Sequence, residues 1–404
     1  MASIHGPGDH FQGMDEEHAR EEKLITVTSP LLPPLEEFLP YLERIWQSKR
    51  LTNNGPFHEE LETALAGFLG VPYLSLFNNG TTALITALQA LDIRDEVITT
   101  PYTFVATPHA LVWNRLTPVF VDIDPHTFNI DPARIEAAIT PRTTAIMPVH
   151  CYGRPCDVEV IQAIADRHGL RVLYDAAHAF GVDDRGGSIL RHGDLSVLSL
   201  HATKVFNTFE GGAIISPTLA LKQHIDQLRN FGFVDETTVT TVGINGKMSE
   251  INAAFGLLQL KHVGQAMHRR RQIDCRYRER LADVAGIQCL PASATCSANF
   301  AYFPILVDDR YGLTRDSLYE RLKEQGIFAR RYFHPLVTEL AVYKDAVRTF
   351  PTPVAHQAAA RVICLPIHPD LRQDDIERVV AVIRDPASAP AIDSPTPNTP
   401  RVLS

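Results

Sequence analysis

The most reactive candidate side chain in this sequence is Lys204, which follows an apolar run that ends at Ser199. A glycine pair, Gly211-Gly212, comes shortly after this lysine. Glycine lets a ligand approach the backbone closely, so a lysine in such a loop is placed to act as a nucleophilic amine. A second candidate, Asp175, ends the apolar run 171–174, and ligand sites of open α/β sheets gather at such strand ends. Taken singly, Lys204 resembles a surface lysine and Asp175 a helix cap.

A third candidate feature is the turn Asn78-Asn79-Gly80-Thr81-Thr82, which lies between an apolar run and a helical pattern. Free backbone N–H groups at a helix start, with glycine beside them, form a cradle suited to one phosphate. A lone Asn-Gly is usually only a turn. A lysine amine, a strand-end carboxylate and a phosphate cradle together are, however, what pyridoxal 5'-phosphate (PLP) requires. The three features therefore favour a PLP enzyme.

An α/β fold must position these residues, because short Val/Ile/Leu-rich runs alternate with longer amphipathic stretches. Parallel strands joined by crossover helices produce this pattern. The candidate strands are residues 73–77, 96–99, 118–121, 144–148, 171–174, 195–199 and 212–216. The candidate helices are residues 82–91, 132–139, 158–168, 219–230 and 249–262, and new strand and helix signals follow at 302–307 and 315–325.

Two domains and two tails are expected along the chain. A boundary near residue 262 gives a large PLP-binding domain over residues 25–262 and a smaller C-terminal domain over residues 263–384. Residues 1–24 show almost no apolar periodicity, so they are predicted to be a disordered tail. Residues 385–404 are rich in Pro, Ala and Ser and are predicted to be a second disordered tail.

Composition excludes several classes of protein. The 38 Lys and Arg residues against 47 Asp and Glu give a net charge of -9, so no nucleic-acid partner is expected. The apolar runs are far shorter than the roughly 20 residues that span a bilayer. No leader peptide pattern opens the chain, so we expect a cytoplasmic protein without membrane contact. The six cysteines show no CxxC spacing, which predicts reduced thiols and no metal site.

Several longer stretches resemble those of a known family. They are residues 51–57, 101–107, 119–125, 148–153, 175–178, 199–212, 243–250 and 365–369. In this order they resemble the PLP-dependent sugar aminotransferases of the DegT/DnrJ/EryC1/StrS family, over residues 25–384. The resemblance implies the fold type I aminotransferase architecture, with a large domain whose mostly parallel sheet is flanked by helices, and a smaller C-terminal α+β domain.

The resemblance also implies roles for single residues. Lys204 would bind PLP covalently and move a proton between carbons, and Asp175 would pair with the pyridinium nitrogen. His178 would lie against the cofactor at the catalytic centre. The other implied contacts are the phosphate-binding Gly80, Thr81 and Ser199, the ring-stacking Phe104, the substrate-site walls His150 and Tyr152, and Asn245, which the family donates from the neighbouring subunit of a homodimer with shared active sites.

Two positions depart from the family pattern. The common Ser-Gly-Thr of the phosphate cradle reads Asn79-Gly80-Thr81, which keeps the glycine and its backbone donors. Lys247 stands where an arginine is usual, which removes a bidentate donor and puts an anion-binding role there in doubt. Neither change touches the lysine or the aspartate, so the core chemistry is expected to be retained.

The segments around His178 and Lys204 also indicate a substrate through the resemblance. The implied reaction moves an amino group from L-glutamate to C4 of dTDP-4-keto-6-deoxy-D-glucose, giving dTDP-4-amino-4,6-dideoxy-D-glucose for surface polysaccharide such as the O-antigen of lipopolysaccharide. Amination at C3 of a dTDP-linked 3-keto-6-deoxyhexose, or at C4 of a GDP-linked sugar to give perosamine, stays open. Lys204 argues against sugar dehydration, because relatives with that activity carry histidine there. A non-catalytic regulator would need a basic face or a further domain, and the sequence shows neither.

Overall fold

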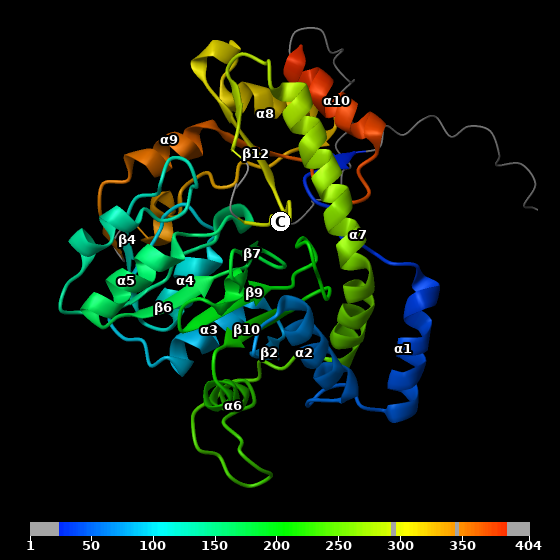
Figure 1. Ribbon diagram of the computed structural model, residues 1–404, viewed down its shortest axis with the longest axis vertical. Helices are drawn as coiled ribbons and strands as arrows, with labels where there is room; N and C mark the ends of the chain where they lie inside the picture. The colour runs from blue at the N-terminus through cyan, green and yellow to red at the C-terminus, as the bar shows by residue number, and fades with distance from the viewer. Residues whose placement is uncertain (1–23, 292–295, 344–346, 386–404) are drawn as a thin grey trace, which may run out of the picture.

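The computed structural model describes residues 24–291, 296–343 and 347–385. The two predicted tails therefore lie outside the described residues, apart from Leu24 and Asp385. Figure 1 shows a larger part built on a sheet and a smaller part above it, with the long helix α7 (Glu250–Leu281) running along both. Within the described ranges, no helix is long and apolar enough to cross a membrane.

The larger part is built on an eight-stranded sheet with the strand order β14-β4-β3-β5-β6-β9-β10-β2. Its strands are β2 (Tyr73–Phe77), β3 (Glu96–Thr99), β4 (Thr117–Phe120), β5 (Thr143–Ile146), β6 (Arg171–Asp175), β9 (Leu195–Ser199), β10 (Gly212–Ser216) and β14 (Arg348–Thr349). Strand β10 runs antiparallel to both of its neighbours, whereas the other neighbouring pairs are parallel. The predicted α/β class with a mostly parallel sheet is confirmed.

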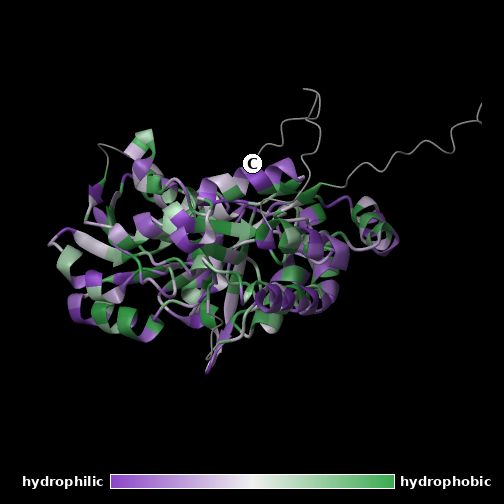
Figure 2. Cartoon of the chain, turned by 90° about the horizontal axis from the view of Figure 1, so that it is seen from above, coloured by the Kyte–Doolittle hydropathy of each residue, from purple (hydrophilic) through white to green (hydrophobic). Residues whose placement is uncertain are grey.

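Helices cover both faces of this sheet. Successive strand residues point to opposite sides, so apolar side chains lie on both faces and both faces must be covered. Val197 of β9 joins one apolar core, whereas its neighbour Leu198 joins the other. The first core contains residues of α3 (Gly80–Ala90), α4 (Ala106–Trp113) and α6 (Leu219–Leu228). The second contains residues of α1 (Leu35–Ser48), α2 (Pro56–Leu69), α5 (Val158–His168) and the first half of α7. In Figure 2 the covering helices carry both polar and apolar residues, as such a position requires.

The smaller part has its own apolar core. Its antiparallel sheet has the order β11-β12-β15, formed by β11 (Ile287–Cys289), β12 (Phe303–Val307) and β15 (Val362–Leu365). The helices α8 (Arg315–Glu324) and α10 (Gln373–Arg384) contribute to this core together with the second half of α7. The remaining elements are β1 (Ile25–Thr26), which pairs with β13 (Ile327–Phe328), the pair β7 (Asp183–Asp184) and β8 (Gly187–Ser188), and α9 (Pro353–Arg361).

The long helix α7 links the two cores. It is continuous through residue 262, so the expected domain boundary falls inside a helix. Val263 belongs to the core of the larger part, whereas Ile273 belongs to that of the smaller part. Ile25 also joins the smaller core, although the sequence suggested that residues 25–262 form one unit. The two-domain division stays a proposal. Within α7, the packing changes from the core of the larger part to the core of the smaller part.

One predicted helix is wrong. Residues 132–139 form two short 3-10 helices, η1 (Pro132–Arg134) and η2 (Glu136–Ala138). Thr140 stands before Pro141, and a residue before proline is disfavoured in the α conformation, so this segment leaves little room for an α-helix. The other 3-10 helices are η3 (Cys151–Gly153), η4 (Ile189–Arg191), η5 (Asp309–Tyr311), η6 (Val337–Glu339) and η7 (Ala341–Tyr343).

Candidate active site

The ends of β2, β6 and β9 lie at one edge of the large sheet. Strand β10 starts at this edge, and its first residue, Gly212, pairs with Phe77 at the end of β2 and with Ser199 at the end of β9. Asp175, at the end of β6, pairs with Val197 of β9. The fold therefore brings the turn after β2, the strand-end carboxylate and the lysine segment to the same edge, as parallel strands require.

Asp175 is a buried carboxylate, 4% exposed, held by two hydrogen bonds. The hydroxyl of Thr107 in α4 donates to Oδ2 at 2.7 Å, and the backbone N–H of Ala177 donates to Oδ1 at 3.1 Å. Burial raises the pKa of Asp175, while both hydrogen bonds and the charge of Lys204 act in the opposite direction. Across the described residues Asp175 forms no ion pair, so this carboxylate is available to a cationic ligand group.

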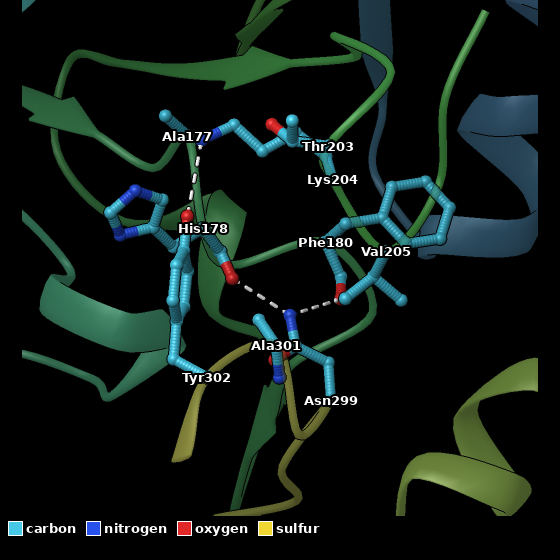
Figure 3. A pocket seen from close by; sticks show the side chains of 9 residues that line it. All are labelled: Ala177, His178, Phe180, Thr203, Lys204, Val205, Asn299, Ala301 and Tyr302. Carbon is cyan, nitrogen blue, oxygen red and sulfur yellow. Dashed lines mark hydrogen bonds between the residues drawn. The ribbon is translucent and has the colours of Figure 1, made fainter. Parts of the chain in front are cut away.

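Lys204 lies between β9 and β10, and its Nζ is 3.4 Å from the hydroxyl of Tyr302, to which it donates a hydrogen bond. Burial lowers the pKa of Lys204 to about 8, although the charge of Asp175 acts in the opposite direction. Figure 3 shows this amine at the wall of a pocket, with His178 and Tyr302 beside it. A lowered pKa leaves more of the amine neutral near pH 7, which a nucleophilic lysine needs.

The phosphate cradle is formed where α3 starts. Asn79 accepts a backbone N–H of the first helical turn at 2.8 Å, and the N–H groups of Gly80 and Thr81 have no carbonyl partner within the helix. A Cβ on Gly80 would lie 3.1 Å from the Cβ of Ser199, so the helix start and the end of β9 are in contact. A Cβ on Gly212 would lie 2.5 Å from the carbonyl oxygen of Asn79. The glycines thus allow the helix start to sit against the strand ends, where an anion can bind.

His178 lies in the same pocket as Lys204 and is 7% exposed. Its Nδ1 accepts a hydrogen bond from the backbone N–H of Tyr152 at 3.2 Å. Its ring centroid is 4.7 Å from that of Tyr302. Burial lowers the pKa of His178 well below its usual range, and the charge of Lys204 acts in the same direction. The imidazole is therefore neutral at physiological pH.

The two predicted substrate-site walls are placed differently. Tyr152 is buried, and its hydroxyl is hydrogen-bonded to that of Tyr102 at 2.7 Å, with its ring 5.7 Å from that of Tyr302. His150 is fully buried, its Nδ1 accepts the N–H of Cys156 at 3.0 Å, and its ring stacks on Tyr174 at 4.7 Å. Tyr152 thus packs behind Tyr302, which lines the pocket, whereas the structure does not bring His150 to the pocket, because its ring lies in the core.

Two further predicted residues stay outside the pocket of their own chain. Phe104 precedes α4, and its side chain is 57% exposed, so it is available to a ligand at the edge that carries Thr107. Asn245 lies in the exposed segment between α6 and α7, where its backbone pairs with that of Asn230. Asn245 is therefore not among the residues that line this pocket in its own chain.

Three contacting residues were not predicted. Thr107 lies inside a stretch that carried the family resemblance, so its polar type at a helix start was a usable signal. Tyr302 and Asn299 come from the segment before β12, more than 90 residues after Lys204, and only the folded chain brings them to the pocket. The described residues contain no group of three or more His, Cys, Asp or Glu side chains that could hold a metal ion.

Fold and site together define an aminotransferase, with a lysine amine, a buried carboxylate and an anion cradle at one sheet edge. The chain belongs to the DegT/DnrJ/EryC1/StrS aminotransferase family, whose sequence profile matches residues 35–384. This confirms the family that the motifs indicated.

Individual relatives cover nearly the whole chain. The dTDP-4-amino-4,6-dideoxy-D-glucose transaminase of Shigella dysenteriae is 58% identical over 364 residues, which are 90% of this chain and 99% of the relative. The enzyme of the same name from Escherichia coli is 53% identical over 90% of this chain and 98% of its own. Among solved structures, DesI in the presence of its TDP-sugar product is similar with a TM-score of 0.86 and 39% identity, covering 89% of this chain and 92% of that chain.

Proposed function

We propose that this protein is a PLP-dependent nucleotide-sugar aminotransferase that moves an amino group from L-glutamate to C4 of dTDP-4-keto-6-deoxy-D-glucose. The observation that carries the proposal is the meeting of Lys204, Asp175 and the Gly80 cradle in a chain 58% identical to the Shigella dysenteriae transaminase. We place the reaction in the cytoplasm, as a step toward surface polysaccharide such as O-antigen.

The residues present fit this cofactor. Asp175 is a buried carboxylate without an ion pair in the described part of the chain, which suits a protonated ring nitrogen. Gly80, Thr81 and Ser199 surround the helix start, which suits a phosphate group. Exposed Phe104 is the aromatic that would cover the ring.

The chain's own groups then have separate tasks. Bound PLP supplies an electron sink for the charge left when a proton leaves the amine-bearing carbon. Asp175 holds the proton on the ring nitrogen, since an anion beside that nitrogen favours its charged form. The neutral amine of Lys204 takes the proton from one carbon and returns it to another, as general base and then general acid. His178 and Tyr302 border this amine and limit the access of water.

The substrate assignment predicts a clear preference among nucleotide sugars. Purified protein with PLP and L-glutamate should convert dTDP-4-keto-6-deoxy-D-glucose to the 4-amino sugar, identified by mass and NMR. Its kcat/KM should exceed those for a dTDP-linked 3-keto isomer and for a GDP-linked 4-keto sugar, because such discrimination depends on transition-state binding. Preference for either competitor would replace the substrate and leave the aminotransferase assignment unchanged.

We also propose that the active unit is a homodimer in which Asn245 of one chain completes the site of the other. An inactive Lys204→Ala chain mixed with an inactive Asn245→Ala chain should then regain activity. Hybrid dimers combine an intact Lys204 and an intact Asn245 in one of their two sites. Equal mixing is expected to restore about a quarter of wild-type activity, because about half of the dimers are hybrids.

The mixing experiment needs a matched control from the same segment. Thr238 is exposed in the segment that also carries Asn245, and its replacement by alanine should leave activity unchanged. Co-purification of an untagged chain with an affinity-tagged partner after mixing would show whether the chains exchange, and size-exclusion chromatography would give the oligomeric state. A fully active Asn245→Ala chain, or a monomer that turns over normally, would reject the shared site.

A further inference from the structure

The amine of Lys204 is held by a tyrosine that comes from the smaller part. Its Nζ donates to the hydroxyl of Tyr302 at 3.4 Å, and no other group in the described ranges forms a hydrogen bond with this nitrogen. Figure 3 shows the phenol oxygen pointing at the amine. A lysine side chain has several rotatable bonds, so an amine without a fixed partner takes many positions. The hydroxyl of Tyr302 therefore selects one of these positions.

The segment that carries Tyr302 is fixed to the larger part. The side chain of Asn299 accepts the N–H of Ala301 at 3.1 Å and donates to the carbonyl of His178 at 2.7 Å. It also donates to the carbonyl of Phe180 at 2.9 Å. The centroid of the Tyr302 ring lies 4.7 Å from that of the His178 ring. The position of the phenol is therefore set by the chain itself.

The groups around the amine leave the phenol protonated. Burial raises the pKa of Tyr302 above its usual range, so the hydroxyl keeps its proton at physiological pH. The other titratable groups that face Lys204 are the carboxylate of Asp175 and the neutral imidazole of His178. Asp175 acts on the amine through its charge, which has little directional preference, whereas a hydrogen bond to the hydroxyl fixes the nitrogen at one point. A neutral hydroxyl forms no ion pair with the amine, so it does not prevent the amine from losing its proton.

We propose that Tyr302 is a positioning residue, whose hydroxyl holds the amine of Lys204 at the point from which this amine moves a proton between two carbons. The inference rests on the proposed function. In that step the lone pair of the Lys204 nitrogen takes a proton from the amine-bearing carbon, and the electron pair of the C–H bond stays with the ligand. The resulting ammonium then returns the proton to a second carbon. The phenol gains and loses no proton, but it limits the positions that the nitrogen can take.

Tyr302→Phe removes the hydroxyl and keeps the ring. With PLP bound and L-glutamate as the sole substrate, the first half of the reaction can be followed in a single turnover by the visible absorption of the cofactor. Its limiting rate should fall by roughly 10²-fold, the cost of a displacement of about 1 Å. The rate ratio between L-glutamate and its 2-deuterated form should be at least that of the wild type, because proton transfer has become the slow step. A wild-type rate, a smaller ratio, or a loss seen only as a higher glutamate requirement would overturn the proposal.

The apoenzyme gives a readout that requires no turnover. Competitive acetylation over a range of pH, followed by peptide mass spectrometry, measures the pKa of Lys204 from the reactivity of its neutral amine. Because the phenol oxygen accepts from the charged amine, Tyr302→Phe should lower this pKa below its value of about 8. More of the amine is then neutral, so a slower half-reaction in this variant cannot result from a lack of neutral amine. An unchanged pKa would show that the hydroxyl does not hold the amine, whichever compound the enzyme aminates.

Tyr277→Phe is the matched control for the loss of a buried hydroxyl. Tyr277 lies in α7 within the core of the smaller part, and its hydroxyl donates to the carbonyl of Pro366 at 3.0 Å. Its removal should lower the Tm and leave the half-reaction and the pKa of Lys204 unchanged, because a buried acceptor without a donor costs stability. Tyr302→Phe should show the opposite pattern, with a Tm close to that of the wild type. Parallel losses of Tm and rate in both variants would show that Tyr302 has only a structural role.

Discussion

Replacing Lys204 with alanine is expected to abolish both turnover and covalent attachment of PLP. Lys204 is the lysine among the residues that line the pocket, and its pKa of about 8 distinguishes it from an exposed lysine near 10.5. The difference raises the neutral fraction at pH 7 by roughly a few hundredfold. Since the same amine is nucleophile and proton carrier, its loss should lower kcat by about 10⁴-fold or more.

Borohydride reduction followed by peptide mass spectrometry would locate the attachment site. In the wild type the label should be on Lys204, and attachment of PLP to the apoenzyme should become faster as the pH rises and level off above about 8, because the neutral amine attacks. Lys261→Ala, at an exposed lysine of α7, is the control and should be labelled and active like the wild type. Cofactor still trapped in Lys204→Ala at another lysine would transfer the catalytic role to that residue.

Local sequence was sufficient to predict seven of the eight strands of the large sheet, but not the short edge strand β14. The strands at Tyr73–Phe77 and Leu195–Ser199 have the predicted bounds, because their apolar runs are short and end at polar or glycine residues. The organisation around residue 262 was harder, because α7 keeps one helical pattern while its surroundings change from one core to the other. The pairing of Ile25 with Ile327 joins distant segments, and no local pattern indicates such a contact.

The difference between local sequence patterns and contacts of distant segments also separates the site residues that were predicted from those that were missed. Asp175 ends β6 and Lys204 lies five residues after the end of β9, so the strand pattern placed them at one sheet edge. Tyr302 reaches Lys204 from the smaller part, which requires the long-range packing of the two cores. His150 has a side chain suited to a ligand wall, but its ring stacks on Tyr174 inside the core. The type of a residue and its neighbours in the sequence do not predict the direction in which its side chain points.

Replacing Asp175 with asparagine should leave PLP bound and reduce kcat by roughly 10²–10³-fold. Only an anion keeps the ring nitrogen protonated, and a neutral amide of the same shape does not.

The effect of Asp175→Asn on stability should be opposite in direction to its effect on activity. Because burial raises the pKa of Asp175, its charged form is disfavoured in the folded apoenzyme at neutral pH, and the amide removes this cost. The Tm of the apoenzyme should therefore stay equal or rise, while activity falls. Near-wild-type turnover would reject the role of the carboxylate at the ring nitrogen, whereas unfolding of the variant would show that the carboxylate has a structural role.

Thr107→Val is the matched test of how the carboxylate is kept ionised. The Thr107 hydroxyl donates to Oδ2 of Asp175 at 2.7 Å and lowers its pKa, so its removal should raise that pKa further. Protonation of Asp175 removes the anion, and the acidic limb of the pH profile of kcat should move to higher pH. As the pH rises and the carboxyl of Asp175 ionises, activity should return toward the wild-type value. Asp175→Asn has no carboxyl to titrate, so its loss should be the same at every pH, and this contrast separates charge on Asp175 from the shape of the site.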